Sequence, residues 1–209
     1  MAVKVKICGI TNLDDALLAV ECGADALGFN FYENSPRYIS PQEASQIISK
    51  LPPEIDKIGV FVNEHLHEIE RACSAGVFDF IQLHGDETSG FVDQLAMRIE
   101  TRIIKVFRVG NGFVPSTALD YAVHGYLLDA DSTRFGGSGE SFDWNIAIEF
   151  KELVPEFYLA GGLTPDNVAD AIKKVRPYAV DVASGVELTK GKKDPKKVEA
   201  FIRNAKDAV

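Results

Sequence analysis

Short apolar, β-branched runs alternate along the chain with longer stretches in which apolar residues recur at helical spacing. Strands that alternate with helices are typical of a parallel sheet, because parallel neighbours need a crossover connection. The pattern therefore predicts an α/β protein built from eight βα units. The eight strand-like runs are 3–8, 25–31, 57–62, 78–83, 102–107, 125–129, 157–160 and 178–182.

Residues suited to helix starts stand before several of the intervening segments. Side chains of Ser, Thr and Asn accept hydrogen bonds from free N–H groups, and proline fits the first helical turn. Glycine stops at Gly23 and Gly76 precede strands in similar surroundings, which indicates a weak internal repeat of the βα module. The predicted starts are Thr11-Asn12, Ser40-Pro41, Asn63 and Thr164-Pro165.

The number of units and the length together favour a closed barrel. Eight units of about 25 residues need about 200 residues, near the lower limit for a (β/α)8 barrel, and the chain has 209. An open doubly wound sheet would show a G-x-G-x-x-G motif after its first strand, whereas Gly9-Ile10-Thr11 follows Cys8 here. We predict a single-domain (β/α)8 TIM barrel over residues 1–209.

Composition and charge narrow the class of partner. The chain is 46% hydrophobic and 25% charged, enough apolar residues for a sizeable core, and its net charge of −9 disfavours nucleic acid and anionic membranes. Lys4 and Lys6 interrupt any signal-peptide core, and no run of eighteen apolar residues follows. We expect a cytoplasmic protein, a monomer or homodimer, that binds a small molecule.

In such a barrel the active site lies where the strands end. Alternation along the first strand directs Val5 and Ile7 towards the helices and Lys6 and Cys8 towards the axis. The same parity turns Asp181 inward on the eighth strand, which neighbours the first once the barrel closes. We therefore predict a Lys6–Asp181 ion pair inside the barrel. Cys8 is either a small buried hydrophobe or a thiol at the mouth.

Other polar residues end or follow strands and have two interpretations each. Asp129 ends the sixth strand as a turn residue or as a proton-transfer group, with Asp131 as a competitor further along the loop. Arg37 follows the second strand and is either solvated or able to bind a carboxylate through two parallel hydrogen bonds. His84 ends the fourth strand, where it lines a pocket or makes a structural hydrogen bond.

Glycine-rich segments follow the sixth, seventh and eighth strands. Glycine lets backbone N–H groups approach an anion closely, and helix starts add a favourable dipole. Their position after the late strands of a barrel predicts a phosphate site. The residues assigned to it are Gly137, Ser138, Gly161, Gly162, Ser184 and Gly185.

Three cysteines and the histidine pair His65–His67 do not form a recognisable metal motif. The cysteines have irregular spacing, and we expect the two histidines to point apart on a solvated helix. No metal site is therefore predicted. Near the chain end is a group of lysines, which we expect to form a solvated face or to help attract phosphate: Lys190, Lys192, Lys193, Lys196 and Lys197.

The order of motifs along the whole chain resembles the phosphoribosylanthranilate isomerase family. The similarity is carried by residues 6–11, 28–31, 35–39, 59–63, 82–85, 127–129, 136–139, 142–144, 160–163 and 181–187. The resemblance implies that Cys8 is a general base, that Asp129 is a general acid, and that Arg37 binds the anthranilate carboxylate. His84 and Asp181, which end or lie on strands at the mouth, are also predicted to contact the substrate.

The implied reaction is an Amadori rearrangement in L-tryptophan biosynthesis that needs no cofactor. It converts N-(5-phosphoribosyl)anthranilate to 1-(2-carboxyphenylamino)-1-deoxyribulose 5-phosphate. An alternative is a barrel of another activity that uses the same glycine loops to hold flavin mononucleotide or a phosphosugar. The reference pKa values of the acid and the base lie in the wrong order for the reaction, since a free thiol is mostly protonated at pH 7 and a free aspartate mostly ionised. Lys6 is expected to lower the pKa of Cys8 if it lies close.

Overall fold

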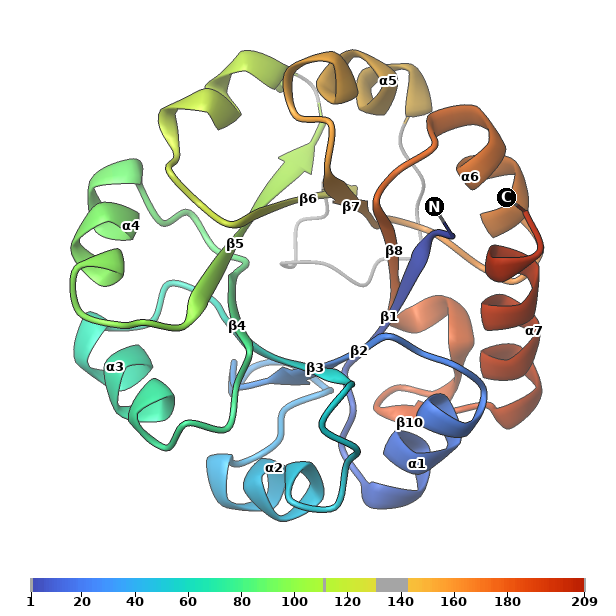
Figure 1. Cartoon of the computed structure of the whole chain (residues 1–209), viewed down its shortest axis with the longest axis horizontal. Coiled ribbons are helices and arrows are strands. Elements are labelled where there is room, and N and C mark those ends of the chain that lie inside the picture. The colour runs from blue at the N-terminus through green and yellow to red at the C-terminus, as the bar shows by residue number, and fades with distance from the viewer. Residues whose placement is uncertain (1, 111, 131–142, 209) are drawn as a thin grey trace.

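The computed structural model describes residues 2–110, 112–130 and 143–208, in which eight parallel strands close into a barrel (Figure 1). Each strand pairs with the next in sequence, and β8 returns to pair with β1. The predicted fold class is thus confirmed. The strands are β1 (Lys4–Cys8), β2 (Ala26–Asn30), β3 (Asp56–Phe61), β4 (Phe80–Leu83), β5 (Arg102–Val109), β6 (Gly125–Ala130), β7 (Phe157–Leu159) and β8 (Ala179–Val182).

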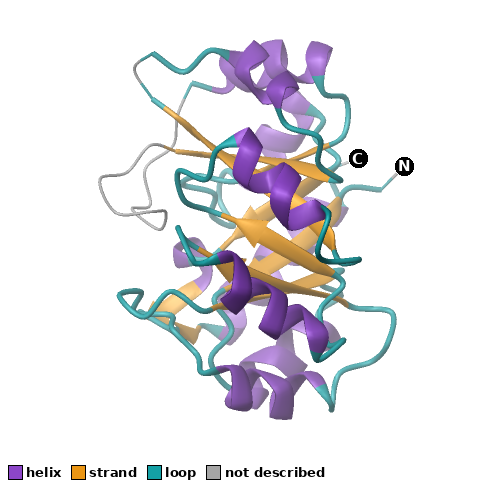
Figure 2. Cartoon of the chain, turned by 90° about the vertical axis from the view of Figure 1, so that its left-hand side faces the viewer, coloured by secondary structure: helices purple, strands orange, loops and turns teal. Residues whose placement is uncertain are grey.

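Helices surround the strands, as the side view shows (Figure 2). They are α1 (Leu13–Glu21), α2 (Pro41–Ile48), α3 (Leu66–Ser74), α4 (Ser89–Ala96), α5 (Trp144–Leu153), α6 (Val168–Val175) and α7 (Pro195–Lys206). Between β5 and β6 the connection is a 3-10 helix, η1 (Pro115–Asp120), so the alternation is less strict than predicted. Among the described residues, no helix combines the length and apolarity that crossing a membrane requires.

Two apolar layers hold the barrel together. Val5 and Ile7 of β1 and Val180 of β8 are fully buried in the layer between sheet and helices. A second cluster fills the barrel interior with side chains of the opposite parity, including Ile104 and Leu127. Alternation thus separates the two layers as predicted, because a side-chain period of two sends neighbours to opposite faces of a strand.

The aspartate that follows each of the two glycine stops makes the same kind of contact. Asp25, after Gly23, accepts a hydrogen bond from the backbone N–H of Val5 at 2.7 Å. Asp79, after Gly76, accepts one from the backbone N–H of Lys57 at 2.9 Å. In both βα modules a carboxylate at the base of one strand therefore secures the preceding strand.

Of the predicted helix starts, Ser40 agrees with the structure, because it forms a capping box with Glu43. The starts predicted at Asn63 and Thr164 differ. Asn63 has a left-handed φ of 52°, and α3 starts later, at Leu66. Its side-chain oxygen accepts the N–H of Asp86 at 2.6 Å, so a contact between two loops takes the group that we expected to cap the helix. After Thr164 a turn intervenes, and α6 begins at Val168.

The chain continues after β8 into a short 3-10 turn and a small hairpin that were not predicted. The turn η2 (Ser184–Val186) leads into β9 (Glu187–Thr189), which pairs in antiparallel fashion with β10 (Lys192–Lys193). Gly191, with φ of 82°, lies at the hairpin turn, and its carbonyl accepts the hydroxyl of Thr11 at 2.6 Å. The hairpin is therefore attached to the loop that follows β1.

Candidate active site

The end of β1 carries a thiol beside a buried ion pair. Lys6 is fully buried, and its Nζ lies 2.9 Å from Asp181 Oδ1 on the neighbouring strand β8, which confirms the predicted pair. Cys8, two residues further along, is half-buried. Opposite it on β2, a Cβ at Gly28 would lie 2.7 Å from Cys8 Sγ and 3.2 Å from Lys6 Nζ. Glycine is needed there because no larger residue leaves room for the thiol.

The surroundings of Cys8 act on its pKa in opposite directions. Burial raises the pKa of the thiol, and Asp181 adds to this effect. Lys6 and Lys193 lower it, but burial dominates and the pKa of Cys8 lies above its ordinary value. Lys6 thus acts in the direction that the sequence suggested, without reversing the effect of burial. The carboxylate of Asp181 and the thiol in turn hold the pKa of Lys6 above its usual range, against the effect of burial.

The end of β6 carries the carboxylate that pairs with a histidine. Asp129 is buried, and its Oδ1 accepts the N–H of Ala130 at 2.9 Å. Its Oδ2 lies 3.2 Å from Nε2 of His84, at the end of β4, although the two atoms are not aligned as a hydrogen bond. The other ring nitrogen of His84 lies 3.0 Å from the side-chain nitrogen of Gln82. The contact with Gln82 fits the interpretation of a structural hydrogen bond, and His84 also lies beside the acid candidate; its role in lining a substrate pocket stays a prediction.

Arg37 is buried in the loop after β2, not solvated. Its Nε and Nη2 donate to the two oxygens of Glu187 on β9 at 2.7 and 2.8 Å. A Cβ at Gly9 would lie 2.5 Å from Cδ of this arginine, so its stem packs directly on the loop after β1. A guanidinium has five N–H donors. One edge is thus occupied by a protein carboxylate, and the described residues give the Nη1 donors no hydrogen-bond acceptor.

The expectation of a solvated lysine face is wrong for one member of the group. Lys193 is buried, while its neighbour Lys192 is exposed. Its Nζ donates to the main-chain oxygen of Cys8 at 2.6 Å and lies 3.5 Å from Glu187 Oε1. The reason is the hairpin, which turns alternate residues inward and gives this ammonium several acceptors.

The glycine segments after β7 and β8 lie against each other. Gly161 and Gly162 both have left-handed φ, of 84° and 64°, and a Cβ on Gly161 would lie 2.5 Å from the backbone nitrogen of Ala130. A Cβ on Gly185 would lie 1.9 Å from the carbonyl oxygen of Leu163. The end of β6 and the loops after β7 and β8 can approach this closely only because these residues lack side chains. Ser184 belongs to the same segment, whereas Gly137, Ser138 and Asp131 lie outside the described residues.

A second buried network, which the sequence did not reveal, supports the segment around His84. Lys105 Nζ donates to the carbonyl of Gly85 and to Glu87 Oε2, both at 2.8 Å, and Glu87 accepts the backbone N–H of Asn63 at 2.8 Å. The alternating pattern gave no signal for it, because a lysine within an apolar strand does not indicate which loop it will contact.

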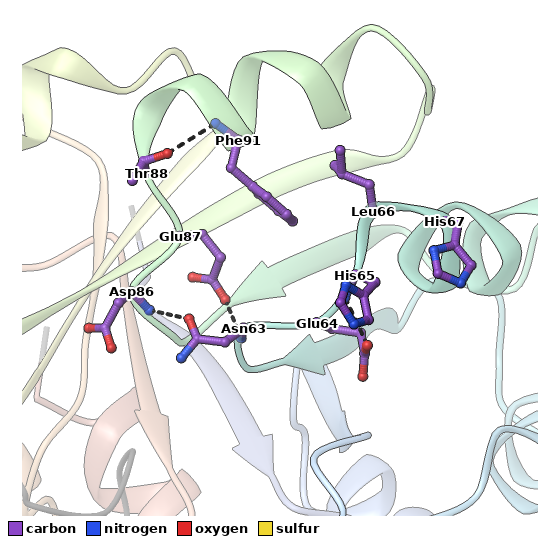
Figure 3. Close-up of a pocket in the computed structure, with 9 residues that line it drawn as sticks. All are labelled: Asn63, Glu64, His65, Leu66, His67, Asp86, Glu87, Thr88 and Phe91. Atoms are coloured by element: carbon purple, nitrogen blue, oxygen red, sulfur yellow. Dashed lines mark hydrogen bonds between the residues drawn. The ribbon is translucent and has the colours of Figure 1, made fainter.

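The loops after β3 and β4, with the first turns of α3 and α4, also form an open pocket of about 540 Å³, whose lining residues are shown in Figure 3. Asn63 and Glu87 are among its lining residues, and none of the predicted site residues lines it. His65 and His67 lie at its edge with their rings stacked 5.8 Å apart. They do not point apart as predicted, because His65 precedes α3.

The strand ends thus bring a thiol, a carboxylate and a histidine to one edge of a closed barrel, beside glycine loops of the kind that bind anions. A closed barrel with such groups at its strand ends is typical of the class of (β/α)8-barrel enzymes that act on small phosphorylated molecules. A family model described as N-(5'phosphoribosyl)anthranilate (PRA) isomerase matches residues 5–204. The chain belongs to this family.

Individual relatives agree over the full length. N-(5'-phosphoribosyl)anthranilate isomerase of Trichlorobacter lovleyi is 53% identical over 211 residues, which cover 99% of this chain and 100% of the relative. Phosphoribosyl anthranilate isomerase from Thermotoga maritima has a crystal structure with a TM-score of 0.91 to this chain, at 47% identity and covering 98% and 99% of the two chains. The chain is therefore an isomerase of tryptophan biosynthesis.

A further solved structure bears on the ligand. It is a phosphoribosyl anthranilate isomerase in complex with reduced 1-(o-carboxyphenylamino)-1-deoxyribulose 5-phosphate, with a TM-score of 0.87 at 45% identity, covering 98% of this chain and 99% of that one. Together with the family assignment, it does not favour the alternative of a flavin-binding barrel.

Proposed function

We propose that the chain performs the Amadori rearrangement of N-(5-phosphoribosyl)anthranilate with Asp129 as general acid and Cys8 as general base. The observation that carries this assignment is the position of the two groups. They end β6 and β1, which are separated by β7 and β8 around the closed barrel, so they face a bound sugar from different sides. A small molecule at the mouth then meets one proton donor and one proton acceptor.

The proton transfers follow in order. Asp129 protonates the ribose ring oxygen as the bond from that oxygen to C1′ breaks, and the nitrogen lone pair forms an iminium with C1′. Cys8 then removes the proton from C2′; the released electron pair forms the C1′–C2′ double bond, and the iminium electrons return to nitrogen. Tautomerisation of this enolamine moves a proton to C1′ and leaves a ketone at C2′. No group outside the chain and the substrate is needed for these steps.

The substrate carboxylate is assigned to Arg37. Because Glu187 occupies the Nε edge, the substrate meets the remaining donors of a guanidinium whose orientation is already fixed. The phosphate is assigned to the glycine loops of Gly161, Gly162, Ser184 and Gly185, with Gly137 and Ser138 contributing from outside the described residues. Asp181 and His84 complete the contacts at the mouth.

Arg37→Lys is expected to weaken the use of substrate strongly, although the charge is kept, because lysine cannot form parallel bonds to Glu187 and to the substrate carboxylate. Arg37→Ala should cost several kcal/mol in kcat/KM, roughly a 10²-fold loss or more, shared between KM and kcat. Steady-state kinetics of the three proteins measure both parameters.

A substrate that lacks the anthranilate carboxylate is the control for Arg37. It should react poorly with the wild type and lose little more with Arg37→Ala, because the partner of the guanidinium is already absent. Equal losses for both substrates would mean that Arg37 acts through Glu187 and the loop, and that another group binds the carboxylate.

Inorganic phosphate and sulfate should compete with substrate if the glycine loops form the phosphate site. Either anion should also raise the melting temperature, since a ligand of the folded state alone stabilises it by mass action. Thermal denaturation and inhibition kinetics at tens of millimolar test both effects, with chloride at equal ionic strength as the control. The absence of both effects would contradict the assignment.

The proposed activity can be tested in cells. The chain should restore growth without tryptophan to a bacterial strain that lacks phosphoribosylanthranilate isomerase, whereas a Cys8→Ser, Asp129→Asn double variant should not. Failure of the wild type, expressed and folded, would contradict the proposed function. The cytoplasmic location and the state as monomer or homodimer remain predictions, for which fractionation and sedimentation are the tests.

A further inference from the structure

The small hairpin after β8 carries a buried cation that the proposed mechanism does not use. Lys193 Nζ donates to the main-chain oxygen of Cys8 at 2.6 Å and of Ala183 at 3.2 Å, and lies 3.5 Å from Glu187 Oε1. We propose that Lys193 is a positioning residue for the isomerisation, which fixes the end of β1 relative to the Glu187–Arg37 pair. The inference rests on the proposed function, because it concerns the base and the carboxylate-binding residue of that reaction.

The contacts of this ammonium come from separate segments of the chain. One acceptor lies at the end of β1, one in the connection after β8, and one on β9. An ammonium has three donors and no acceptor, and the Lys193 side chain is wholly buried. Removing such a group from water is costly unless its donors are satisfied. The three segments are therefore held together by one side chain whose own requirements fix their separation.

Lys193 and Glu187 are both held in place by further protein groups, without any ligand. The backbone N–H of Lys193 donates to the buried Asp15 in α1 at 2.8 Å. Glu187 accepts two hydrogen bonds from Arg37 and one from the backbone N–H of Gly191 at 3.2 Å. Arg37 is thus oriented by a carboxylate that in turn touches the cation beneath Cys8. The base and the carboxylate-binding residue belong to one buried network before substrate arrives.

The charge of Lys193 also acts on the thiol. Three charged groups act on Cys8: Lys6 from β1, Asp181 from β8 and Lys193 from β10. The two cations lower the pKa of Cys8, whereas Asp181 and burial raise it. Removal of the Lys193 charge should therefore raise the pKa of the thiol further. If Lys193 only stabilised the hairpin, its removal would not be expected to raise the pKa of Cys8.

The test uses a protein in which Cys22→Ala and Cys73→Ala leave Cys8 as the single thiol. Lys193→Met keeps most of the apolar stem of the side chain and removes the ammonium, and Lys192→Met, at an exposed position of the same strand, is the matched control. The pH dependence of Cys8 alkylation by iodoacetamide should shift upward by about half a pH unit to one unit in Lys193→Met alone. Its kcat/KM should fall about 10-fold to 100-fold. If the pH midpoint of Cys8 alkylation in Lys193→Met equals that in Lys192→Met, the proposal is overturned.

Glu187→Gln provides the second arm, which also decides the matter if Lys193→Met does not fold. It keeps the shape of the side chain but removes the carboxylate that orients Arg37 and raises the pKa of Lys193, so KM should rise about tenfold through Arg37 while the alkylation midpoint does not fall. A KM equal to that of Lys192→Met, or a midpoint that falls, would overturn the proposal. Alkylation needs no substrate, so it measures the effect of Lys193 on Cys8 whether or not the enzyme turns over. A wild type that does not convert phosphoribosylanthranilate would refute the proposed function, but it would not change the alkylation result.

Discussion

Cys8→Ser is expected to lower kcat by about 10²-fold or more while substrate binding persists. The hydroxyl occupies nearly the space of the thiol beside Gly28, but it is far harder to ionise and cannot accept the proton from C2′ at neutral pH. Steady-state kinetics give the loss in kcat, and equilibrium binding of a reduced product analogue shows that the site is intact. Full activity in Cys8→Ser would end the assignment of the base.

Two controls belong to this experiment. Cys22→Ala and Cys73→Ala should keep wild-type kinetics, since these cysteines lie at the end of α1 and within α3, behind the sheet. Because burial raises the pKa of Cys8, the thiolate forms only above the ordinary thiol range. The residual kcat/KM of Asp129→Asn, in which no general acid is left to ionise, should therefore keep rising with pH towards that range. A basic limb that is complete below the ordinary thiol pKa would point to another base.

Asp129→Asn is expected to reduce kcat by about 10²-fold to 10⁴-fold, the contribution typical of a lost general acid. The amide cannot donate the proton that opens the ribose ring, yet it can still accept the N–H of Ala130 and keep the local structure. The loss should therefore appear in kcat without a comparable change in the melting temperature.

Asp131→Asn is the matched control, two residues further along the chain. It changes a charge but not the side chain that lies beside His84, so its kinetics should stay near those of the wild type. If Asp131→Asn is the inactive variant, the strand-six register on which the assignment depends is shifted by one pleat repeat.

Strand periodicity predicts the barrel and the ends of its strands. The period of two places Lys6 and Asp181 inside, and closure of the barrel makes their strands neighbours, so the ion pair at 2.9 Å follows from the sequence. Cys8, Asp129 and His84 are found in the same way, because a polar side chain that ends an apolar strand stands out from the pattern. Each of these predictions needs only the pattern within one strand, or the knowledge that two strands are neighbours.

Contacts between distant loops could not be predicted. Lys193 looks like one of several solvated lysines, because the hairpin that buries it is only a few residues long and shows no period of its own. Asn63 resembles a helix cap, yet it contacts the loop after β4 instead. The pairing of Arg37 with Glu187 joins residues 150 positions apart. Each of these is decided by which loops meet at the barrel mouth, and local sequence carries no signal for that.

In the proposed mechanism this barrel isomerises phosphoribosylanthranilate with Asp129 as the proton donor and Cys8 as the proton acceptor. The most direct test of this mechanism is the fluorescence of freshly prepared phosphoribosylanthranilate mixed with the purified wild type, the Cys8→Ser variant and the Asp129→Asn variant. Anthranilate-type fluorescence should disappear rapidly with the wild type, and at least about 10²-fold more slowly with either variant. Fluorescence that persists with folded wild-type protein would contradict the proposed activity, and fluorescence that decays equally fast with all three proteins would contradict the roles of Asp129 and Cys8.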